Sequence, residues 1–277
     1  MLNINKKTLM ILLVVLLSII YLLEIPVTNE SDKNIFNWSL KQNGKQHYLF
    51  ANTGEWGKCI SGNCEDTFGI YLSPFGKYEG EFKNAKKHGT GTFKWNEGET
   101  YTGQWQNDKM HGQGIYTWPN GNRYEGQWLN NKKNGEGILQ WANGDKYTGQ
   151  WKENEMHGHG NYLWANGIKI EGEWVNGIRK DHGTITWPNG DKYTGSLKVN
   201  DMHGQGIMEW SNGNKYSGDW TDGKSNGTGT YIWANGDKYT GQLKDNKMHG
   251  DGIFYYANGT IKKGKWEYDA FIEEKIK

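Results

Sequence analysis

A block of 23 residues recurs along the chain without insertion or deletion, and this fixed period constrains the fold more than any other feature. The reference copy is YTGQWQNDKMHGQGIYTWPNGNR (101–123). A constant period of this size is typical of repeat proteins, in which each unit packs only against its neighbours. The other copies begin at Tyr78, Tyr124, Tyr147, Ile170, Tyr193, Tyr216 and Tyr239, and a truncated ninth begins at Lys262.

The first half of each repeat predicts a β-strand with one aromatic face. Tyr101, Gly103 and Trp105 alternate with Thr102 and Gln104. An alternation of period two is the mark of a strand, because successive side chains point to opposite faces. One face should therefore carry rings and glycine, and the other polar side chains.

The second half predicts a second strand, in which Gly112, Gly114, Tyr116 and Trp118 share one face. The Tyr116 position is apolar or aromatic in all eight copies, and the Trp118 position is always Trp or Tyr. Glycine weakens a strand unless something approaches the backbone closely. We expect a ring from a neighbouring strand to lie over these glycines, which would make a continuous aromatic stripe.

The link between repeats reads W-[P/A/S]-N-G-x-x-Y, and two turns fit it. A two-residue type I′ turn at Asn-Gly would pair Thr117 with Tyr124 and put Trp118 and Tyr124 on opposite faces. A three-residue loop over 119–121 pairs Tyr116 with Tyr124 instead and keeps the rings together. It also places the proline of this loop where a type I turn wants its fixed φ. We therefore predict the three-residue loop.

Each repeat is thus one β-hairpin, and the hairpins should join into an all-β, elongated and twisted antiparallel meander. Eight repeats supply about sixteen strands, which at ~4.8 Å per strand make a sheet of order 75 Å long. Tyr268, Phe271, Ile272 and Ile276 have helical spacing, which predicts a short C-terminal capping helix. The expected divisions are 1–25 (apolar signal-anchor helix), 26–50 (polar tether), 51–77 (cysteine-containing hairpin), 78–266 (repeat array) and 267–277 (capping segment).

The N-terminus has an uncharged apolar run from Thr8 to Leu23, preceded by Lys6 and Lys7. A cleaved signal peptide has an apolar run of roughly 7–15 residues, and a membrane-spanning helix needs about 20. The run lies between these lengths, and the residues after it (EIPVTNES) offer no A-x-A-like cleavage site, which favours an uncleaved single-pass anchor. The lysines should stay cytoplasmic, so the array is expected in the periplasm or outside the cell, and secreted if the segment is cleaved.

The two cysteines, Cys59 and Cys64, lie in WGKCISGNCEDTFG, where Gly-Asn suits a tight turn. An exported protein favours a disulfide between them, and free thiols are the alternative. Zinc would need two further ligands, and no second Cys or His pair has a matching spacing.

Several classes of function lack support in the sequence. A net charge of +1 gives no electrostatic basis for nucleic-acid binding. No catalytic motif or singular carboxylate pair is found in a supporting context, so no enzyme activity, catalytic residue or cofactor is expected. The recurring histidines would lie about 10 Å apart on the sheet, too far to share a zinc ion, and no metal is expected. These histidines are His88, His111, His157, His203 and His249.

The pattern Y-x-G-x-W-x-x-x-x-x-H-G-x-G, as in YTGQWQNDKMHGQG and YEGEFKNAKKHGTG, resembles the MORN repeat (membrane occupation and recognition nexus). The resemblance covers Tyr78 to about Trp266, and CISGNC…GIY is similar to the start of bacterial MORN proteins. It implies a non-catalytic β-hairpin array that binds lipids or proteins, scaffolds assemblies or dimerises. Repeat five departs from the pattern at Ile170 and Asp181, where we expect a kink or altered twist.

A second period of 46 residues runs through the hairpin loops. Even repeats carry Met-His-Gly, and odd repeats carry basic residues. Descent from a duplicated pair would explain this, but so would a row of basic clusters on one sheet edge, about 19 Å apart, that binds anionic headgroups or an acidic partner. The candidate basic residues are Lys86, Lys87, Lys132, Lys133, Arg179 and Lys180.

Three functions fit these features. The first is a membrane-anchored scaffold that offers an aromatic–glycine groove and the basic loops to a protein or an anionic phospholipid. The second is a structural homo-oligomer joined through sheet edges or grooves, and the third is a cell-wall enzyme that binds glycan on its rings. The candidate groove residues are Tyr101, Trp105, Trp118, Tyr124, Trp128, Trp141, Tyr147, Trp151 and Trp164.

Overall fold

The computed structural model describes residues 38–42, 45–49 and 56–272. Within these ranges the regular secondary structure is entirely β-strand. The first strands are β1 (Trp38–Gln42), β2 (Lys45–Leu49), β3 (Trp56–Gly62) and β4 (Phe68–Ser73). The strands of the eight repeats are β5 (Gly76–Lys83), β6 (Lys86–Trp95), β7 (Thr100–Gln106), β8 (Lys109–Thr117), β9 (Arg123–Leu129), β10 (Lys132–Gln140), β11 (Lys146–Lys152), β12 (Glu155–Leu163), β13 (Lys169–Val175), β14 (Ile178–Thr186), β15 (Lys192–Lys198), β16 (Asp201–Glu209), β17 (Lys215–Thr221), β18 (Lys224–Ile232), β19 (Lys238–Lys244) and β20 (Lys247–Tyr255). The last strands are β21 (Ile261–Glu267) and β22 (Ala270–Ile272).

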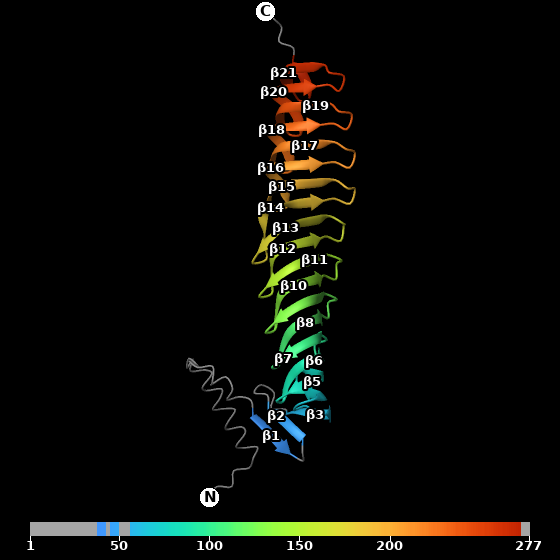
Figure 1. The fold of residues 1–277 in the computed structure, drawn as a ribbon, viewed down its shortest axis with the longest axis vertical. Coiled ribbons are helices and arrows are strands. Elements are labelled where there is room, and N and C mark those ends of the chain that lie inside the picture. The colour runs from blue at the N-terminus through green and yellow to red at the C-terminus, as the bar shows by residue number, and fades with distance from the viewer. Residues whose placement is uncertain (1–37, 43–44, 50–55, 273–277) are drawn as a thin grey trace, which may run out of the picture.

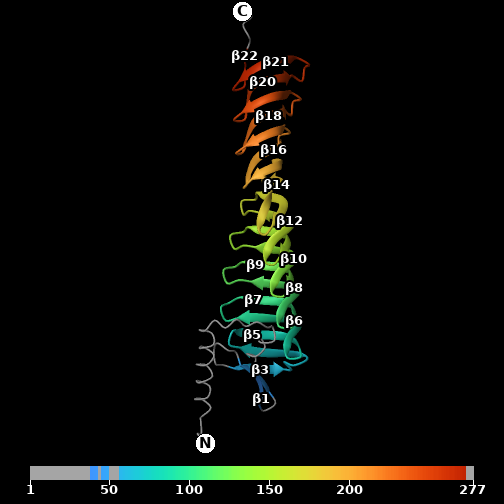
Figure 2. The same cartoon turned by 90° about the vertical axis from the view of Figure 1, so that its left-hand side faces the viewer.

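Each strand pairs antiparallel with the next one along the chain, from β1 to β22. The hairpins stack into a column, with β1 at one end and β21 and β22 at the other (Figures 1 and 2). The predicted all-β meander of tandem hairpins is confirmed. Because each hairpin pairs with the hairpins next to it in sequence, a site on this sheet is built from adjacent repeats.

The link between repeats is the predicted three-residue loop. Tyr116 pairs with Tyr124. Closer to the loop, Trp118 N donates to Asn122 O at 2.9 Å. Inside the loop, Gly121 N donates to Trp118 O at 3.0 Å, and Gly121 has φ +88°. A type I turn followed by a left-handed glycine gives this pattern, and it keeps the rings of both strands on one face.

The core lies on the aromatic face of this single sheet. The seven tyrosines that begin a repeat are 0% exposed, and the residue four positions later, which is Trp, Phe or Leu, is buried in all eight repeats. The Tyr101 ring fills the space over Gly114 on the paired strand, where a methyl group would overlap it. Trp128 of the next repeat donates from Nε1 to Gly114 O at 3.2 Å. The expectation of rings over glycines is therefore confirmed, and burial of each ring contributes about 2–3 kcal/mol.

A bulge that the sequence did not reveal interrupts each hairpin. In repeat two the pairing passes from Gly103↔Gly114 to Gln104↔His111, so residues 112–113 of β8 have no partner on β7, although they pair with β9. The side chain of Gln104 holds the bulge, because its Oε1 accepts from the backbone N of residue 113 at 2.8 Å. The bulge re-aims the rest of β8, as bulges commonly do.

Both ends of the sheet differ from expectation. The capping-helix prediction is wrong for the described residues 267–272, because 270–272 form β22, in which Phe271 pairs with Trp266. An open sheet edge offers unpaired backbone groups, and these favour a further strand over a short helix. At the other end, part of the predicted tether forms β1 and β2, and β2 pairs with β3.

The predicted N-terminal membrane helix and residues 273–277 lie outside the described residues. No helix in the described ranges is long and apolar enough to cross a bilayer.

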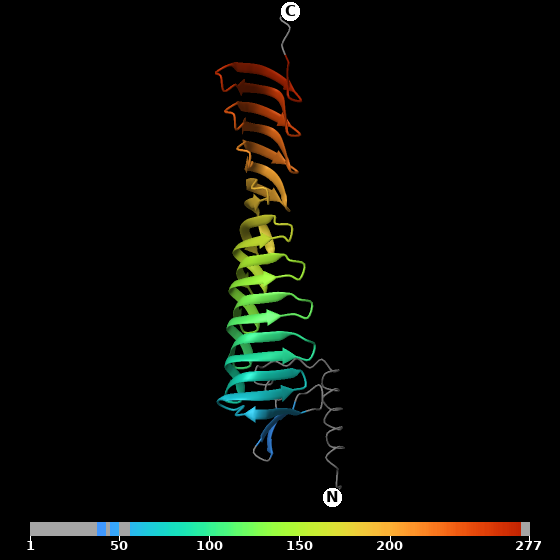
Figure 3. The ribbon, with the colours of Figure 1, turned by 90° about the vertical axis from the view of Figure 1, so that its right-hand side faces the viewer.

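Repeat five breaks the regular core. The buried side chains form one cluster that ends at Trp174 and a second that begins at Ile170. Arg179 lies over Gly172, in the place that a tyrosine ring takes in other repeats. Figure 3 shows the column narrowing around β14, where the two halves meet.

Candidate binding surface

A row of partly exposed rings runs along the aromatic face, and we call it the tryptophan ladder. It is formed by the aromatic residue at the end of each second strand or directly after it, immediately before the three-residue loop. Successive members belong to successive repeats, so they lie two strands, about 9.6 Å, apart. The ladder residues are Trp95, Trp118, Trp141, Trp164, Trp187, Trp210, Trp233 and Tyr256, all of intermediate exposure.

Ring contacts fix the orientation of the ladder. Tyr116 lies between Trp95 and Trp118, with centroids 5.4 Å and 4.6 Å away. Tyr162 and Tyr231 hold the equivalent place in repeats four and seven. Aliphatic side chains take this place at Leu139, Ile185 and Met208, so the stacked rings come in short groups.

The nine predicted groove residues divide into two sets. The first strand of each hairpin places its rings in the core, although the edge of Trp105 also lines a cavity described below. Those buried rings are Tyr101, Trp105, Tyr124, Trp128, Tyr147 and Trp151. The remaining three, Trp118, Trp141 and Trp164, belong to the ladder and are accessible. The sequence placed all nine residues on one face but did not separate core from surface.

The alternation between methionine and basic residues also falls on this face. Lys133 pairs with Trp128 across its hairpin. Met110 pairs with Trp105 in the same way one repeat earlier. The Lys133 Nζ lies 4.0 Å from the centre of the Trp151 ring and 5.5 Å from that of Tyr124. Burial against these rings disfavours the ammonium form and lowers the pKa of Lys133 to about 8.

Lys87 occupies the same position in repeat one. Its Nζ lies within 6.0 Å of the ring centres of Tyr78, Phe93 and Trp105. Burial lowers the pKa of Lys87, and the Asp108 carboxylate, 3.7 Å away, opposes that effect. The Lys87 ammonium therefore already has a carboxylate partner.

The predicted basic pairs do not form clusters. Lys86 and Lys132 are exposed, unlike the half-buried lysine that follows each of them, and Lys132 forms an ion pair with Glu153 at 3.1 Å. In repeat five, Lys180 pairs with Glu173 at 2.7 Å, and the Arg179 guanidinium donates to the backbone O of 180 and 199. Adjacent strand residues point to opposite faces, which separates each pair.

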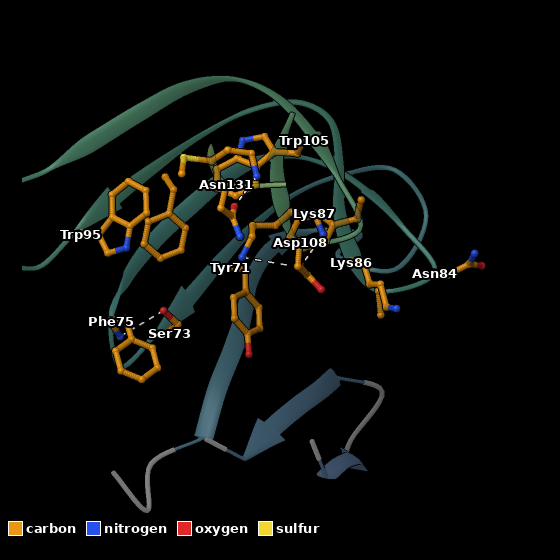
Figure 4. A pocket seen from close by; sticks show the side chains of 14 residues that line it. Tyr71, Ser73, Phe75, Asn84, Lys86, Lys87, Trp95, Trp105, Asp108 and Asn131 are labelled. Carbon is orange, nitrogen blue, oxygen red and sulfur yellow. Dashed lines mark hydrogen bonds and ion pairs between the residues drawn. The ribbon is translucent and has the colours of Figure 1, made fainter. Parts of the chain in front are cut away.

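Two cavities open on the ladder side. The larger, of about 610 Å³, lies between Lys87, Phe93 and Trp95 of repeat one and Trp105 and Met110 of repeat two (Figure 4).

The second cavity, of about 410 Å³, is five repeats away and lies between Met202, Met208 and Trp210 of repeat six and Trp220 and Ser225 of repeat seven. These five residues hold the same positions in their repeats as those of the first cavity. Equivalent repeat positions therefore line both cavities.

The remaining candidate residues lie elsewhere. A disulfide joins Cys59 on β3 to Cys64 in the turn before β4, with Cα atoms 6.0 Å apart. The Nδ1 atoms of the five recurring histidines are buried and have no hydrogen-bond partner among the described residues. In the part of the chain that the structure describes, no three His, Cys, Asp or Glu residues group as metal ligands do.

A family model described as MORN repeat matches residues 78–100, 101–123, 124–146, 147–169, 171–192, 193–215, 216–238 and 239–261. These matches cover more than half of the 277 residues. The repeat-five match starts one residue late, at 171, which skips the exceptional Ile170. No curated protein is similar enough to the chain to count as a match.

Similar solved structures share little sequence with the chain. The SAS-4 (dCPAP) TCP domain of Drosophila melanogaster is 16% identical, covers 56% of this chain and 84% of that one, and has a TM-score of 0.38. The TCP10 domain of Danio rerio CPAP is 10% identical, covers 83% and 99%, and has a TM-score of 0.37. A streptogramin B lyase is 12% identical, covers 83% and 80%, and has a TM-score of 0.17. Likenesses this low do not bear on function.

Proposed function

Because the chain belongs to the MORN repeat family, a repeat scaffold and binding type of protein, we propose that it binds a protein or an anionic phospholipid along the tryptophan ladder. The observation that carries the proposal is the division of the rings. The first strand of each hairpin uses its rings for the core, whereas the ladder leaves one partly exposed ring per repeat. A regular row of accessible aromatic residues has the composition of a binding surface.

The array is non-catalytic in this proposal, and its lysines help to select the partner. Lys133 is held among rings at 4.0 Å and 5.5 Å, so an approaching anion would meet a cation in a poorly solvated place. Such a charge discriminates between partners more strongly than the exposed Lys132, which already has Glu153 as a partner.

We also propose that the apolar run Thr8–Leu23 anchors the chain in a membrane with the array exported. The support is the length of the run, its lack of charge and the preceding lysines. Fusing reporter enzymes that are active on only one side of the membrane after Lys277 tests the orientation. Reporter activity on the cytoplasmic side would contradict it.

The binding proposal is tested with the full-length chain kept in mild detergent. Partners are captured from a membrane extract that contains both protein and lipid. The Trp118→Ala/Trp141→Ala variant removes two accessible ladder rings, and Thr102→Ala is the control on the opposite face. The expected result is a protein or lipid that wild type and control retain and the ladder variant loses.

Retention of the same partners by all three proteins would contradict the proposal. Light scattering on the same samples detects self-association, the alternative use of this surface. Loss of an oligomer in the ladder variant, without loss of any other partner, would favour that alternative.

A further inference from the structure

We propose that the occupant of the tryptophan ladder is a proline-rich segment of a partner protein in the polyproline II conformation, with an acidic residue beside Lys133. This inference rests on the proposed binding function and names the chemical class of the partner. It follows from the spacing of the ladder, from the shape of the space between its rings and from the placement of charge.

The spacing selects the backbone conformation of the ligand. Successive ladder rings are two strands, about 9.4–9.8 Å, apart. A polyproline II helix has three residues per turn at about 3.1 Å each, so the same face returns every ~9.3 Å. In an extended strand, side chains on the same face repeat every ~6.6 Å. In an α-helix they repeat after seven residues, about 10.5 Å. Over four ladder rings, the repeat of a polyproline II helix falls out of register with the rings by about 1 Å, and that of an α-helix by about 3 Å.

The rings have the chemistry that proline recognition uses. Aromatic grooves bind polyproline II segments because proline rings pack flat on aromatic rings and the ligand is already ordered. Trp118 and Trp164 are held against Tyr116 and Tyr162 at 4.6 Å and 4.9 Å, so they present fixed faces. Trp141 has an aliphatic neighbour, Leu139, at the place where Trp118 has Tyr116.

The cavities accept the side chains that lie between two ladder contacts. Phe93, Lys87 and Met110 line the larger cavity together with Trp95 and Trp105. The same repeat positions enclose the cavity between Trp210 and Trp220. Each of these cavities lies beside a ladder ring, Trp95 or Trp210, so a ligand that follows the ladder can place a side chain in it.

The charges favour an acidic ligand. In the described ranges no carboxylate lies within ion-pair distance of Lys133, whereas Lys87 has Asp108 at 3.7 Å. Lys87 and Lys133 are two repeats, about 19 Å, apart. Six residues of polyproline II span ~18.6 Å, so one acidic residue in every six keeps in step with these lysines.

The test uses synthetic peptides and the full-length chain in mild detergent, with binding followed by tryptophan fluorescence and by calorimetry. The probe is three copies of Pro-Pro-Glu-Pro-Pro-Gln. One matched peptide replaces every proline with glycine, and another replaces every glutamate with lysine. We expect the probe to bind at least roughly tenfold more tightly than either matched peptide, because glycine removes the preformed conformation and lysine reverses the charge.

Three single variants locate the site. Trp141→Ala should weaken binding of the probe roughly tenfold, as expected for an aromatic anchor. Lys133→Gln, which removes no ring, should weaken it roughly three- to tenfold. Lys132→Gln removes the same charge from the neighbouring residue on the other face and should leave binding unchanged. Far-ultraviolet circular dichroism establishes that each variant is folded.

The proposal is overturned if the probe does not bind, if the glycine peptide binds equally, or if Trp141→Ala and Lys133→Gln leave its affinity unchanged. Ladder-dependent binding of a chitin oligosaccharide or of anionic vesicles, without binding of the probe, would also overturn it. In that event the capture experiment with the ladder variant would still support a binding scaffold. Failure of that experiment as well would remove both proposals.

Discussion

At the residue scale, one tyrosine hydroxyl in each regular repeat donates a hydrogen bond to the backbone three residues further along the chain. Tyr239 Oη donates to the backbone O of Gln242 at 2.8 Å, and the same bond recurs for Tyr101 and Tyr193. These side chains are fully buried. Burial disfavours the phenolate, and it raises the pKa of Tyr147, Tyr193 and Tyr239 to about 12.

These tyrosines predict that the array unfolds in alkali. Their folded pKa exceeds the ordinary value of 10.0, so the unfolded chain releases protons first. Stability is therefore complete below pH 10 and is lost between about pH 10 and 12. Circular dichroism and tyrosinate absorbance, recorded together, should change in one step. Titration of the seven fully buried tyrosines near pH 10 with the sheet intact would contradict this prediction.

A second residue-scale prediction concerns Lys133, whose charge lies among rings without a carboxylate partner in the described ranges. Lys133→Met places the residue of the even repeats there and should raise the free energy of unfolding by about 1 kcal/mol. The buried lysine destabilises the fold fully below about pH 8, and this destabilisation disappears as the pH approaches 10.5. The stabilisation by methionine should therefore disappear over the same pH range. Denaturant unfolding at several pH values measures it.

The matched control for this prediction is Lys132→Met. It changes an exposed lysine of the same hairpin and should not stabilise the chain. Equal effects of the two substitutions would show that burial of Lys133 is not the cause.

At the element scale, the two-residue turn within each hairpin forms hydrogen bonds to the preceding repeat. These turns lie at one side of the sheet. Asn154 has φ +78°, and its N donates to Lys133 O at 3.0 Å. Its Oδ1 accepts from Lys133 N at 2.8 Å. Gly177 keeps only the backbone bond, to Met156 O at 2.9 Å. The turn chemistry therefore stabilises both its own hairpin and the preceding one.

This arrangement predicts different effects for two substitutions of Asn154. Asn154→Gly keeps the left-handed backbone and one hydrogen bond, as Gly177 does. Asn154→Ala loses the same side-chain bond and adds the strain of an alanine at positive φ, so it should destabilise the chain by about 1 kcal/mol more. Urea unfolding of the two variants checks this. A more stable alanine variant would contradict it.

The opposite side of the sheet held a signal that sequence reasoning missed. Asn122 Oδ1 accepts from the backbone N of Ala142 at 2.9 Å, and four further repeats form this bond. Pro119 and Pro188 have no N–H to donate, and the residues that would accept it are Glu99 and Ile168 instead of Asn or Asp. Loss of the donor N–H in one loop thus goes together with loss of the Asn or Asp acceptor in the preceding loop. This joint change in the sequence indicates that consecutive loops are in contact.

At the scale of the whole molecule, repeat five divides the array. The core clusters separate there, and the buried Arg179 Nε has no hydrogen-bond partner in the described part of the chain. In a linear array, stability is the sum of each repeat and its interfaces, so one weak repeat weakens the coupling of the two halves.

We therefore predict that the wild-type array unfolds in two steps. A variant with Ile170→Tyr, Arg179→Met and Asp181→Gly restores the regular repeat and should unfold in one step at a higher denaturant concentration. Limited proteolysis should cut the wild type first within 176–181 and spare the variant there. A single transition in both proteins would contradict the predicted division.

The sequence predicted the features that depend on neighbouring residues. Ring alternation defined the aromatic face, and the position of Pro119 distinguished the three-residue loop from the two-residue turn. The bulge beside Gly112 depends on a hydrogen bond that the Gln104 side chain accepts from the backbone N–H of residue 113, so spacing alone could not reveal it. β22 depends on competition between an open edge and helical spacing, and the edge prevailed.

The candidate site was harder to predict than the fold. The period showed that Trp105 and Trp118 share a face, but the degree of burial depends on where the hairpins bend and stack. The lysine pairs were predicted as clusters because they are adjacent in sequence. Adjacent strand residues instead diverge, which left Lys133 among the rings and Lys132 in solvent.

The end-to-end order of the hairpins has a mechanical consequence. The two ends of the described column lie at opposite extremes (Figure 1), so a pull between them separates one strand pair at a time. Each released repeat converts about 10 Å of column into roughly 75 Å of extended chain, because an extended residue spans ~3.3 Å. The molecule would lengthen under load in equal increments, beginning at the hairpin with the weakest lateral bonds.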